Sequence, residues 1–352
     1  MARDLSDVEA PLHRWLATHL GLDQRDLDVE IEAHTGGGYS NDILFVTARH
    51  ADDVDRLVVR LPPAGPTLFP SYDLPMEVAV QDAVAAHGVP VPRPLVLETD
   101  ATVLGTPFLL MGRVDGHDPG ELPVADPWLA AAGVEQQRAL HERFVDLLAE
   151  IHTCPWRDTS LADVLRGAEG NLLDEIRFWQ DHVDWTFDGH PPTIVADAFV
   201  WCHQRRPHDE PPASVLWGDV RLGNVVFDDD FAPAAVLDWE MASIGPAELD
   251  VGWYTALEGM TEHFFGQRVP GFLTRDELVA RHERAIGRPL VALEWFEIFA
   301  MLRSAVLNIR ADRLEADRRG KPYRPVEANA VLTYALDAIA TYDAAHPDKG
   351  FS

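Results

Sequence analysis

Three polar residues in the middle of the sequence have the types and spacing that phosphoryl transfer requires. Asp219 is followed five residues later by Asn224, and Asp238 ends the apolar run AAVLD. Phosphoryl transfer from a nucleotide uses one carboxylate to position the acceptor hydroxyl, and an amide with a second carboxylate to hold Mg²⁺ against the phosphates. The alternative is that these residues only cap a turn and end a hairpin. Their order, each beside an apolar strand, favours the kinase-type site.

The segment around these residues, WGDVRLGN followed by AVLDWEMASIGPAELD, resembles the catalytic core of the aminoglycoside phosphotransferase family. The resemblance runs from about residue 30 to 345 and is most specific at 217–250. It implies an α+β, bilobal protein kinase-like fold, with a small β-rich N-terminal lobe and a larger, mainly helical C-terminal lobe. The family usually has His where this chain has Trp217, and we expect that change to remove a polar group that braces the loop. It also implies that Asp250 braces the catalytic loop.

The N-terminal part has the patterns of a nucleotide-binding lobe. Alternating and apolar runs predict strands at 29–34, 43–48 and 56–61, a helix at 75–87, and further strands near 94–98 and 107–111. The turn between the first two strands could fold over phosphates through its backbone N–H groups and a hydroxyl, or it could be an ordinary hairpin turn. Its candidate cofactor-binding residues are Gly36, Gly37, Gly38 and Ser40.

A cation on the third strand is the next requirement of a kinase-like nucleotide site. Such folds use a lysine there, paired with a glutamate on the following helix. The only lysines in this chain are Lys321 and Lys349, so Arg60 is the candidate for the phosphate-binding cation and Glu77 for its partner. Arginine keeps the charge, although its fork geometry differs from that of lysine. The alternative is a surface ion pair on an edge strand.

The family resemblance also implies a hinge at residues 107–113. There, backbone groups of Met111 to Arg113 would pair with the edge of the adenine ring.

The Asp-, Gly- and Pro-rich stretch 115–127 predicts a boundary between two domains. We expect a nucleotide-binding lobe with an opening helix at 1–114, and a C-terminal lobe with the catalytic loop and the acceptor site at 115–352. Helical patterns dominate the second lobe, apart from a β interruption at 214–240 that contains two short apolar strands. An acidic cluster in this lobe fits either a cationic acceptor or a solvated helix. Its members are Asp174, Glu175, Asp181, Asp184 and Asp188.

Composition narrows the classes of partner. Asp and Glu number 58 against 29 Lys and Arg, a net charge of −29, which argues against electrostatic binding to nucleic acid or to an anionic membrane. The acidic N-terminus does not resemble a signal peptide, so we expect a cytoplasmic protein. Cys154 and Cys202 are too few for a disulfide framework and are expected to be reduced core residues.

Together these features predict a small-molecule kinase that moves the γ-phosphoryl group of ATP, with GTP as the alternative, to a hydroxyl of an aminoglycoside-like or other hydroxylated metabolite. In this hypothesis Asp219 is catalytic, and Asn224 and Asp238 hold Mg²⁺. A nucleotide-binding pseudokinase without turnover is the alternative, suggested by Trp217 and Arg60. A hydrolase with two catalytic carboxylates is a more distant alternative, against which the amide of Asn224 argues.

Overall fold

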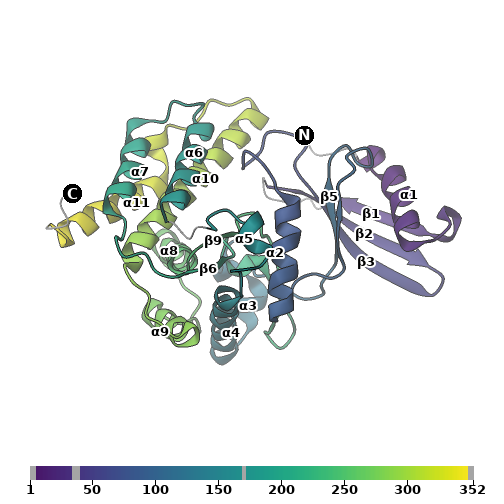
Figure 1. Ribbon diagram of the computed structural model, residues 1–352, viewed down its shortest axis with the longest axis horizontal. Helices are drawn as coiled ribbons and strands as arrows, with labels where there is room; N and C mark the ends of the chain where they lie inside the picture. The colour runs from purple at the N-terminus through teal and green to yellow at the C-terminus, as the bar shows by residue number, and fades with distance from the viewer. Residues whose placement is uncertain (1–4, 34–39, 169–171, 348–352) are drawn as a thin grey trace. The chain divides into compact units, whose positions relative to one another are not determined.

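The computed structural model describes residues 5–33, 40–168 and 172–347, and the chain in it forms two compact units (Figure 1). The first unit comprises Met1–Val78 and Pro92–Asp115, and the second comprises Ala79–Val91 and Gly116–Ser352. Helix α2 (Leu74–His87) passes from the first unit into the second. We had expected a single division after residue 114; in the structure a second segment, 79–91, also belongs to the helical unit.

The first unit is built on a five-stranded antiparallel sheet of order β1-β2-β3-β5-β4. Its strands are β1 (Asp28–Ala33), β2 (Asp42–His50), β3 (Asp53–Leu61), β4 (Leu95–Glu98) and β5 (Phe108–Gly112). Each strand expected from the sequence overlaps one of these. Because β3 is the middle strand of the sheet, its buried face carries side chains into the interior of the unit.

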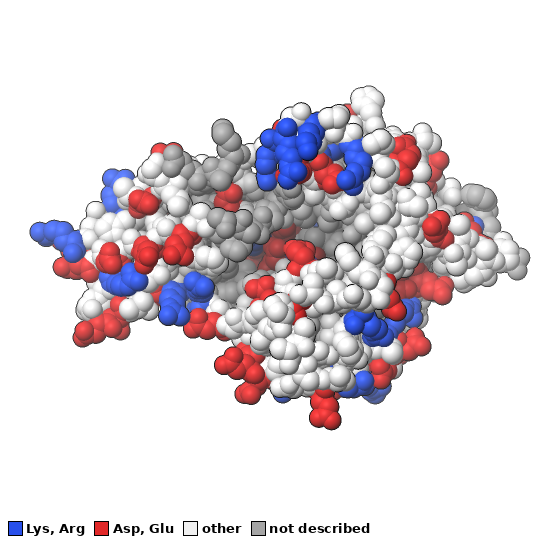
Figure 2. Space-filling view, turned by 180° about the vertical axis from the view of Figure 1, so that it is seen from behind, with Lys and Arg blue, Asp and Glu red and all other residues white. Residues whose placement is uncertain are grey.

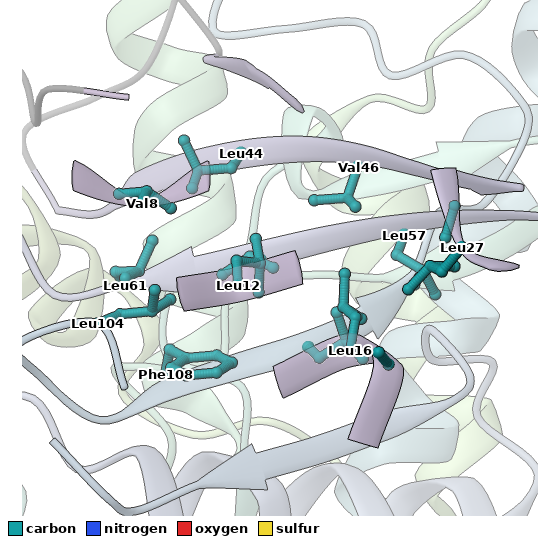
Figure 3. Close-up of a cluster of buried hydrophobic side chains, with 14 residues drawn as sticks. Val8, Leu12, Leu16, Leu27, Leu44, Val46, Leu57, Leu61, Leu104 and Phe108 are labelled. Carbon is teal, nitrogen blue, oxygen red and sulfur yellow. The ribbon is translucent and has the colours of Figure 1, made fainter. Parts of the chain in front are cut away.

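Helix α1 (Glu9–Leu20) covers one face of this sheet (Figure 3). Leu12 and Leu16, four residues apart and therefore on one face of the helix, are fully buried against sheet residues that include Leu44 and Phe108. Burial of each such side chain contributes about 1.5–3 kcal/mol. The helix ends at Gly21, whose φ of 68° lets its N–H bond back to the carbonyls of the last turn.

The second unit is mainly helical, as the sequence patterns predicted. Its helices after α2 are α3 (Pro127–Ala131), α4 (Val134–Thr153), α5 (Leu161–Val164), α6 (Leu172–Thr186), α7 (Thr193–Arg205), α8 (Glu248–Phe265), α9 (Arg275–Ile286), α10 (Leu293–Arg319) and α11 (Ala330–Ala345). Short 3-10 turns occur in the first unit at Leu5–Asp7 and Gln24–Asp26, and in the second unit at Pro123–Ala125, Leu222–Asn224 and Val326–Ala328. Helix α10 packs against α6, α7, α8 and α11, so it is the central helix of this unit (Figure 1).

Two short antiparallel ladders interrupt these helices. Strand β6 (Ala213–Leu216) pairs with β9 (Ser243–Pro246), and β7 (Val225–Phe227) pairs with β8 (Pro233–Val236). We had predicted two strands within 214–240; in the structure β6, β7 and β8 overlap that range, and β9 lies beyond it. Strands of three or four residues carry little periodicity, so their number is hard to read from the sequence.

Charged side chains of both signs lie on the surface. On the face seen in Figure 2, acidic side chains are spread among uncharged ones, and Lys and Arg occur in small groups. Cys154 and Cys202 are free and buried, as predicted. Within the described residues, no helix has the length and apolar character needed to cross a membrane.

Candidate active site

Asp219 lies in the loop between β6 and β7, and the structure brings it together with Asn224, as the sequence predicted. The Asn224 amide Nδ2 donates to Asp219 Oδ2 at 2.9 Å and to the Asp219 carbonyl at 3.1 Å. The short 3-10 turn at Leu222–Asn224 reverses the chain over this distance. The five-residue spacing therefore produces a closed loop in which the amide holds one oxygen of the carboxylate.

Arg221 is a member of this site that the sequence reasoning missed. Its Nε lies 3.0 Å from Asp219 Oδ2, and its Nη1 contacts the carboxylate of Glu121. The available signal was a basic residue two positions after the candidate catalytic carboxylate, in the run DVRLGN. Its guanidinium supplies the positive charge closest to Asp219 in the described ion pairs.

The carboxyl of Asp219 is in an environment that weakens its acidity. Burial raises its pKa above the ordinary value, Arg221 opposes that rise, and the nearby carboxylate of Asp238 adds to it. The side chain is 16% exposed, so part of it is accessible to solvent. A carboxylate with a raised pKa is suited to receive a proton from a hydroxyl.

Asp238 lies two residues after the end of β8. The ladder between β7 and β8, which starts next to Asn224, positions it. The Leu237 N–H donates to the Asn224 carbonyl at 2.8 Å, which continues the pairing of Val225 with Val236 by one step. Asp238 has a φ of 58°, in the left-handed region that is uncommon for residues other than glycine. Such backbone conformations cost about 1–3 kcal/mol and concentrate at functional sites.

Trp217 braces the loop, contrary to our expectation that its substitution for the family's histidine removes a polar brace. Its indole Nε1 donates to the carbonyls of Leu237 and Asp238, at 2.9 and 3.2 Å. The side chain is fully buried. The indole thus ties the strand that leads into Asp219 to the backbone that carries Asp238, and an indole N–H can do this because it is a donor.

Asp250, at the start of α8, holds the other side of the same loop, in the role that the family resemblance implied. Its two carboxylate oxygens accept the N–H groups of Trp217 and Gly218, at 2.8 and 3.0 Å. His152 Nε2 lies 3.1 Å from Asp250 Oδ2 and fixes the carboxylate from α4. Gly218 has a φ of 92°, and a Cβ there would lie 2.3 Å from the Met241 carbonyl, so only glycine fits.

The Arg60–Glu77 pair forms inside the first unit. Arg60 Nη1 contacts Glu77 Oε2, and the two side chains are 6% and 0% exposed. Because β3 is an inner strand and the pair is buried, the alternative of a surface ion pair on an edge strand is wrong. A buried pair of opposite charges persists only with good geometry, since each charge loses its hydration.

The remaining nucleotide-site candidates are the residues of the glycine-rich turn and of the expected hinge. Gly36, Gly37 and Gly38 fall outside the described residues, and Ser40 is half-buried just before β2. In the expected hinge, Met111 pairs with Val58 and Leu95 across the sheet.

The amide groups next to Met111 are used within the sheet. Gly112 N donates to the Pro94 carbonyl, and Arg113 N donates to the Arg56 carbonyl. A contact of Gly112 or Arg113 with an adenine edge would therefore use a carbonyl group.

The acidic cluster of α6 does not form one pocket. Glu175 is buried and accepts from Arg166 Nη1 at 2.8 Å and from Trp179 Nε1 at 2.9 Å. Asp181, Asp184 and Asp188 are exposed. The structure therefore favours the solvated acidic helix over a cationic-acceptor site.

The donor set suits a magnesium ion shared with phosphates rather than an all-protein metal site. Within residues 5–33, 40–168 and 172–347, no group of three or more His, Cys, Asp or Glu side chains could hold a metal ion. Mg²⁺ is commonly bound by one or two protein oxygens while phosphates and water complete its shell. Asn224 and Asp238 offer hard oxygens on adjoining ends of one ladder and fit that requirement.

We predict that Trp217→Phe lowers the free energy of unfolding by about 1–3 kcal/mol, because the Leu237 and Asp238 carbonyls lose a buried donor. Chemical denaturation measures this. Trp239→Phe is the matched control, since that buried indole donates to a single carbonyl, Val236 O at 3.2 Å, and should cost less. Equal stability of Trp217→Phe and wild type would contradict the bracing role.

Comparison with known proteins relates this geometry to a family. Acyl-CoA dehydrogenase family member 11 of Gallus gallus is 30% identical over 199 residues, 56% of this chain and 25% of that protein. The human protein of the same name is 26% identical over 250 residues, 68% of this chain and 30% of its own length. The chain thus spans about a quarter to a third of the length of these curated relatives.

Solved structures show the same fold. A Ralstonia eutropha protein assigned as an aminoglycoside phosphotransferase has a TM-score of 0.64 at 21% identity, over 94% of this chain and 93% of its own. Choline kinase LicA of Streptococcus pneumoniae has a TM-score of 0.59 at 12% identity, over 95% of this chain and 99% of its own. The predicted α+β protein kinase-like fold, with its small β-rich and larger helical lobes, is therefore confirmed.

A family model described as the phosphotransferase enzyme family matches residues 31–285. The matched part includes Arg60, Glu77 and the whole segment from Trp217 to Asp250. The match extends over more than half of the chain, and the protein belongs to the phosphotransferase enzyme family.

Proposed function

We propose that this protein is a small-molecule kinase that transfers the γ-phosphoryl group of ATP or GTP to a hydroxyl of its acceptor. The observation that carries the proposal is the loop in which Asp219 is bonded to Asn224 and paired with Arg221, with Asp238 close enough to raise its pKa. This arrangement supports the assignment of Asp219 as the catalytic residue and of Asn224 and Asp238 as magnesium ligands.

In this proposal, Asp219 accepts the proton of the acceptor hydroxyl as the oxygen forms its bond to the γ-phosphorus. The bond between that phosphorus and the β,γ-bridging oxygen breaks, and the nucleoside diphosphate leaves. Arg221 holds the carboxylate in place and opposes the rise of its pKa that burial causes. Magnesium bound at Asn224 and Asp238 would neutralise phosphate charge.

Nucleotide binding is supported by the structural neighbours. Aminoglycoside 2'-phosphotransferase-IIIa was solved with GDP, and a mutant of aminoglycoside phosphotransferase APH(4)-Ia with AMP-PNP and hygromycin B. Both classes of purine nucleotide thus occur among proteins of this fold. Arg60 is the residue that we propose contacts the phosphates, with Glu77 fixing its rotamer.

The names of the structural neighbours and of the curated relatives suggest the class of acceptor. Structural neighbours include choline, ethanolamine, macrolide and aminoglycoside kinases, all of which phosphorylate hydroxylated small molecules. The curated relatives are named for acyl-CoA dehydrogenation, and a hydroxyacyl-CoA is an acyl thioester that also carries a hydroxyl to accept phosphate. We therefore propose testing hydroxyacyl-CoA compounds first, with amino alcohols, macrolides and aminoglycosides as the comparison set, by mass shift on phosphorylation.

The pseudokinase alternative loses its two supporting observations. Trp217 supplies a donor to the loop, and Arg60 forms a buried pair with its expected glutamate. A turnover assay decides between the kinase and the pseudokinase.

We predict that Asp219→Asn lowers phosphoryl transfer by about 10²- to 10⁴-fold, because the amide cannot take the hydroxyl proton. Nucleotide binding should stay close to wild type in a calorimetric titration. Asp229→Asn is the matched control, since it makes the same change at an exposed position in the β7–β8 turn. Activity of Asp219→Asn within about threefold of wild type would remove Asp219 from the mechanism.

We predict that Asp238→Ala weakens the stabilisation by nucleotide that depends on Mg²⁺, because a hard oxygen ligand is lost. Melting temperatures with ATP, with and without Mg²⁺, provide the measurement, and Asp229→Ala provides the control. If Mg-ATP raises the melting temperature of Asp238→Ala as much as that of wild type, the metal is held elsewhere.

We predict that Arg60→Lys retains measurable transfer while Arg60→Met loses most of it, because charge matters more than shape at a phosphate-binding position. Glu77→Gln should cause a smaller loss, and the two losses should be non-additive in a double-mutant cycle. Melting temperatures must accompany the kinetics, because removing one partner of a buried pair typically costs about 3–5 kcal/mol. Wild-type turnover by folded Arg60→Met would assign the pair a structural role alone.

A further inference from the structure

Arg303, on helix α10, is a buried arginine that lies outside the part of the chain matched by the family model. Its side chain is 2% exposed, whereas an arginine normally keeps its charged end in water. Burial lowers its pKa to about 10, so the guanidinium remains charged near neutral pH. A buried charge is costly, and this one therefore calls for a structural explanation.

Three aromatic rings surround this guanidinium, and a carboxylate lies beyond normal hydrogen-bond distance from it. Its carbon Cζ lies 4.6 Å from the ring centroid of Trp253, 5.1 Å from that of Trp179 and 5.7 Å from that of Phe299. The nearest carboxylate in a described ion pair is Glu175, at 3.9 Å, and it is already bonded to Arg166. The aromatic faces therefore stabilise the cation together with the charge of nearby carboxylates, among which Glu175 and Asp250 contribute most.

The guanidinium reaches the residue before the proposed catalytic carboxylate. Arg303 Nη2 donates to the Gly218 carbonyl at 3.3 Å. The N–H of the same glycine is held by Asp250, and the Met241 carbonyl leaves no room for a side chain there. The peptide that joins Gly218 to Asp219 is thus bonded on its carbonyl side by Arg303, while Asp250 holds the preceding N–H.

We propose that Arg303 is a positioning residue that fixes the Gly218–Asp219 peptide and, through it, the direction of the Asp219 carboxylate. The inference rests on the proposed role of Asp219 in phosphoryl transfer. Arg303 lies 84 positions after Asp219 in the sequence, and the central helix α10 places it beside the loop. A hydrogen bond from a rigid helix restrains the peptide because the aromatic faces fix the guanidinium itself.

The first experiment detects the contact without any acceptor. Gly218–Asp219 is the only Gly-Asp dipeptide in the sequence, so labelling glycine with ¹³C at the carbonyl and aspartate with ¹⁵N gives a single coupled NMR resonance. Arg303→Met should move or broaden that resonance, because the carbonyl loses its donor. Arg303→Lys keeps the cation but shortens the reach, and should move it less.

Arg310→Met is the matched control for this measurement. Arg310 lies two turns further along α10 and also stacks on an aromatic ring, with Cζ 4.2 Å from the centroid of Trp185. It is not bonded to the catalytic loop in any described contact, so its variant should leave the Gly218–Asp219 resonance unchanged.

The second experiment measures transfer with the acceptor that the screen identifies. Arg303→Met should lower kcat by about 10- to 100-fold, since small displacements of a reacting group have effects of this size. KM for the nucleotide should stay within about twofold of wild type, and Arg303→Lys should recover part of kcat. A purely core-filling role would lower the melting temperature without this split between kcat and KM.

The outcomes separate the inference from the proposed function. A wild-type resonance in folded Arg303→Met, or an unchanged kcat, overturns the positioning role. If Arg303→Met does not fold, Arg303→Lys decides, because a moved resonance with reduced kcat supports the role and wild-type values of both overturn it. If wild type transfers no phosphate to any acceptor, the proposed function fails, while the resonance still tests the contact.

Discussion

The carboxylate of Asp250 is the interaction on which the candidate site depends. It accepts two consecutive backbone N–H groups, from Trp217 and Gly218, and so fixes the chain immediately before Asp219. These groups lie in a bend where β6 has ended, so no strand or helix can satisfy them. A charged acceptor makes stronger hydrogen bonds than a neutral one, and in a buried loop the cost of leaving two N–H groups unpaired would be high. His152 holds that carboxylate from a third element.

Buried charge is the recurring means by which this protein holds its functional groups. In the first unit Arg60 contacts Glu77, and in the second Arg303 is held mainly by aromatic rings. Neither arrangement is an efficient source of stability, since apolar residues would fill the same space without the desolvation cost. Both restrict a charged group to one position, as our proposals for Arg60 at phosphate and for Arg303 at the Asp219 loop require.

Trp217 shows that a motif can change its residue and keep its physical task. Histidine and tryptophan differ in size and charge, but each has a ring N–H that can donate a hydrogen bond. In this chain the indole reaches across to the carbonyls of Leu237 and Asp238, and its ring fills the space beneath the loop. Reading the substitution as the loss of a polar group was wrong because the sequence does not show where the ring N–H points.

The sequence by itself predicted the strands of the sheet from periodicity, and the fold class from the resemblance that one short motif segment carries. It also indicated the set Asp219, Asn224 and Asp238 as the proposed site, from their types and spacing. Such local signals survive without knowledge of the rest of the chain. The sequence could not identify Arg221 as a partner of Asp219, because nothing in its spacing gives the direction of the side chain. Arg303 could not be found either, since its contact depends on how α10 packs against the loop. One strand within 214–240, and β9 beyond it, were missed because strands of three or four residues carry little periodicity. The contact of Arg303 with Gly218 and the pairing of β6 with β9 join segments far apart in the chain, so tertiary structure decided them. The contact of Arg221 with Asp219 is local, but the direction of a side chain is set only by the folded loop.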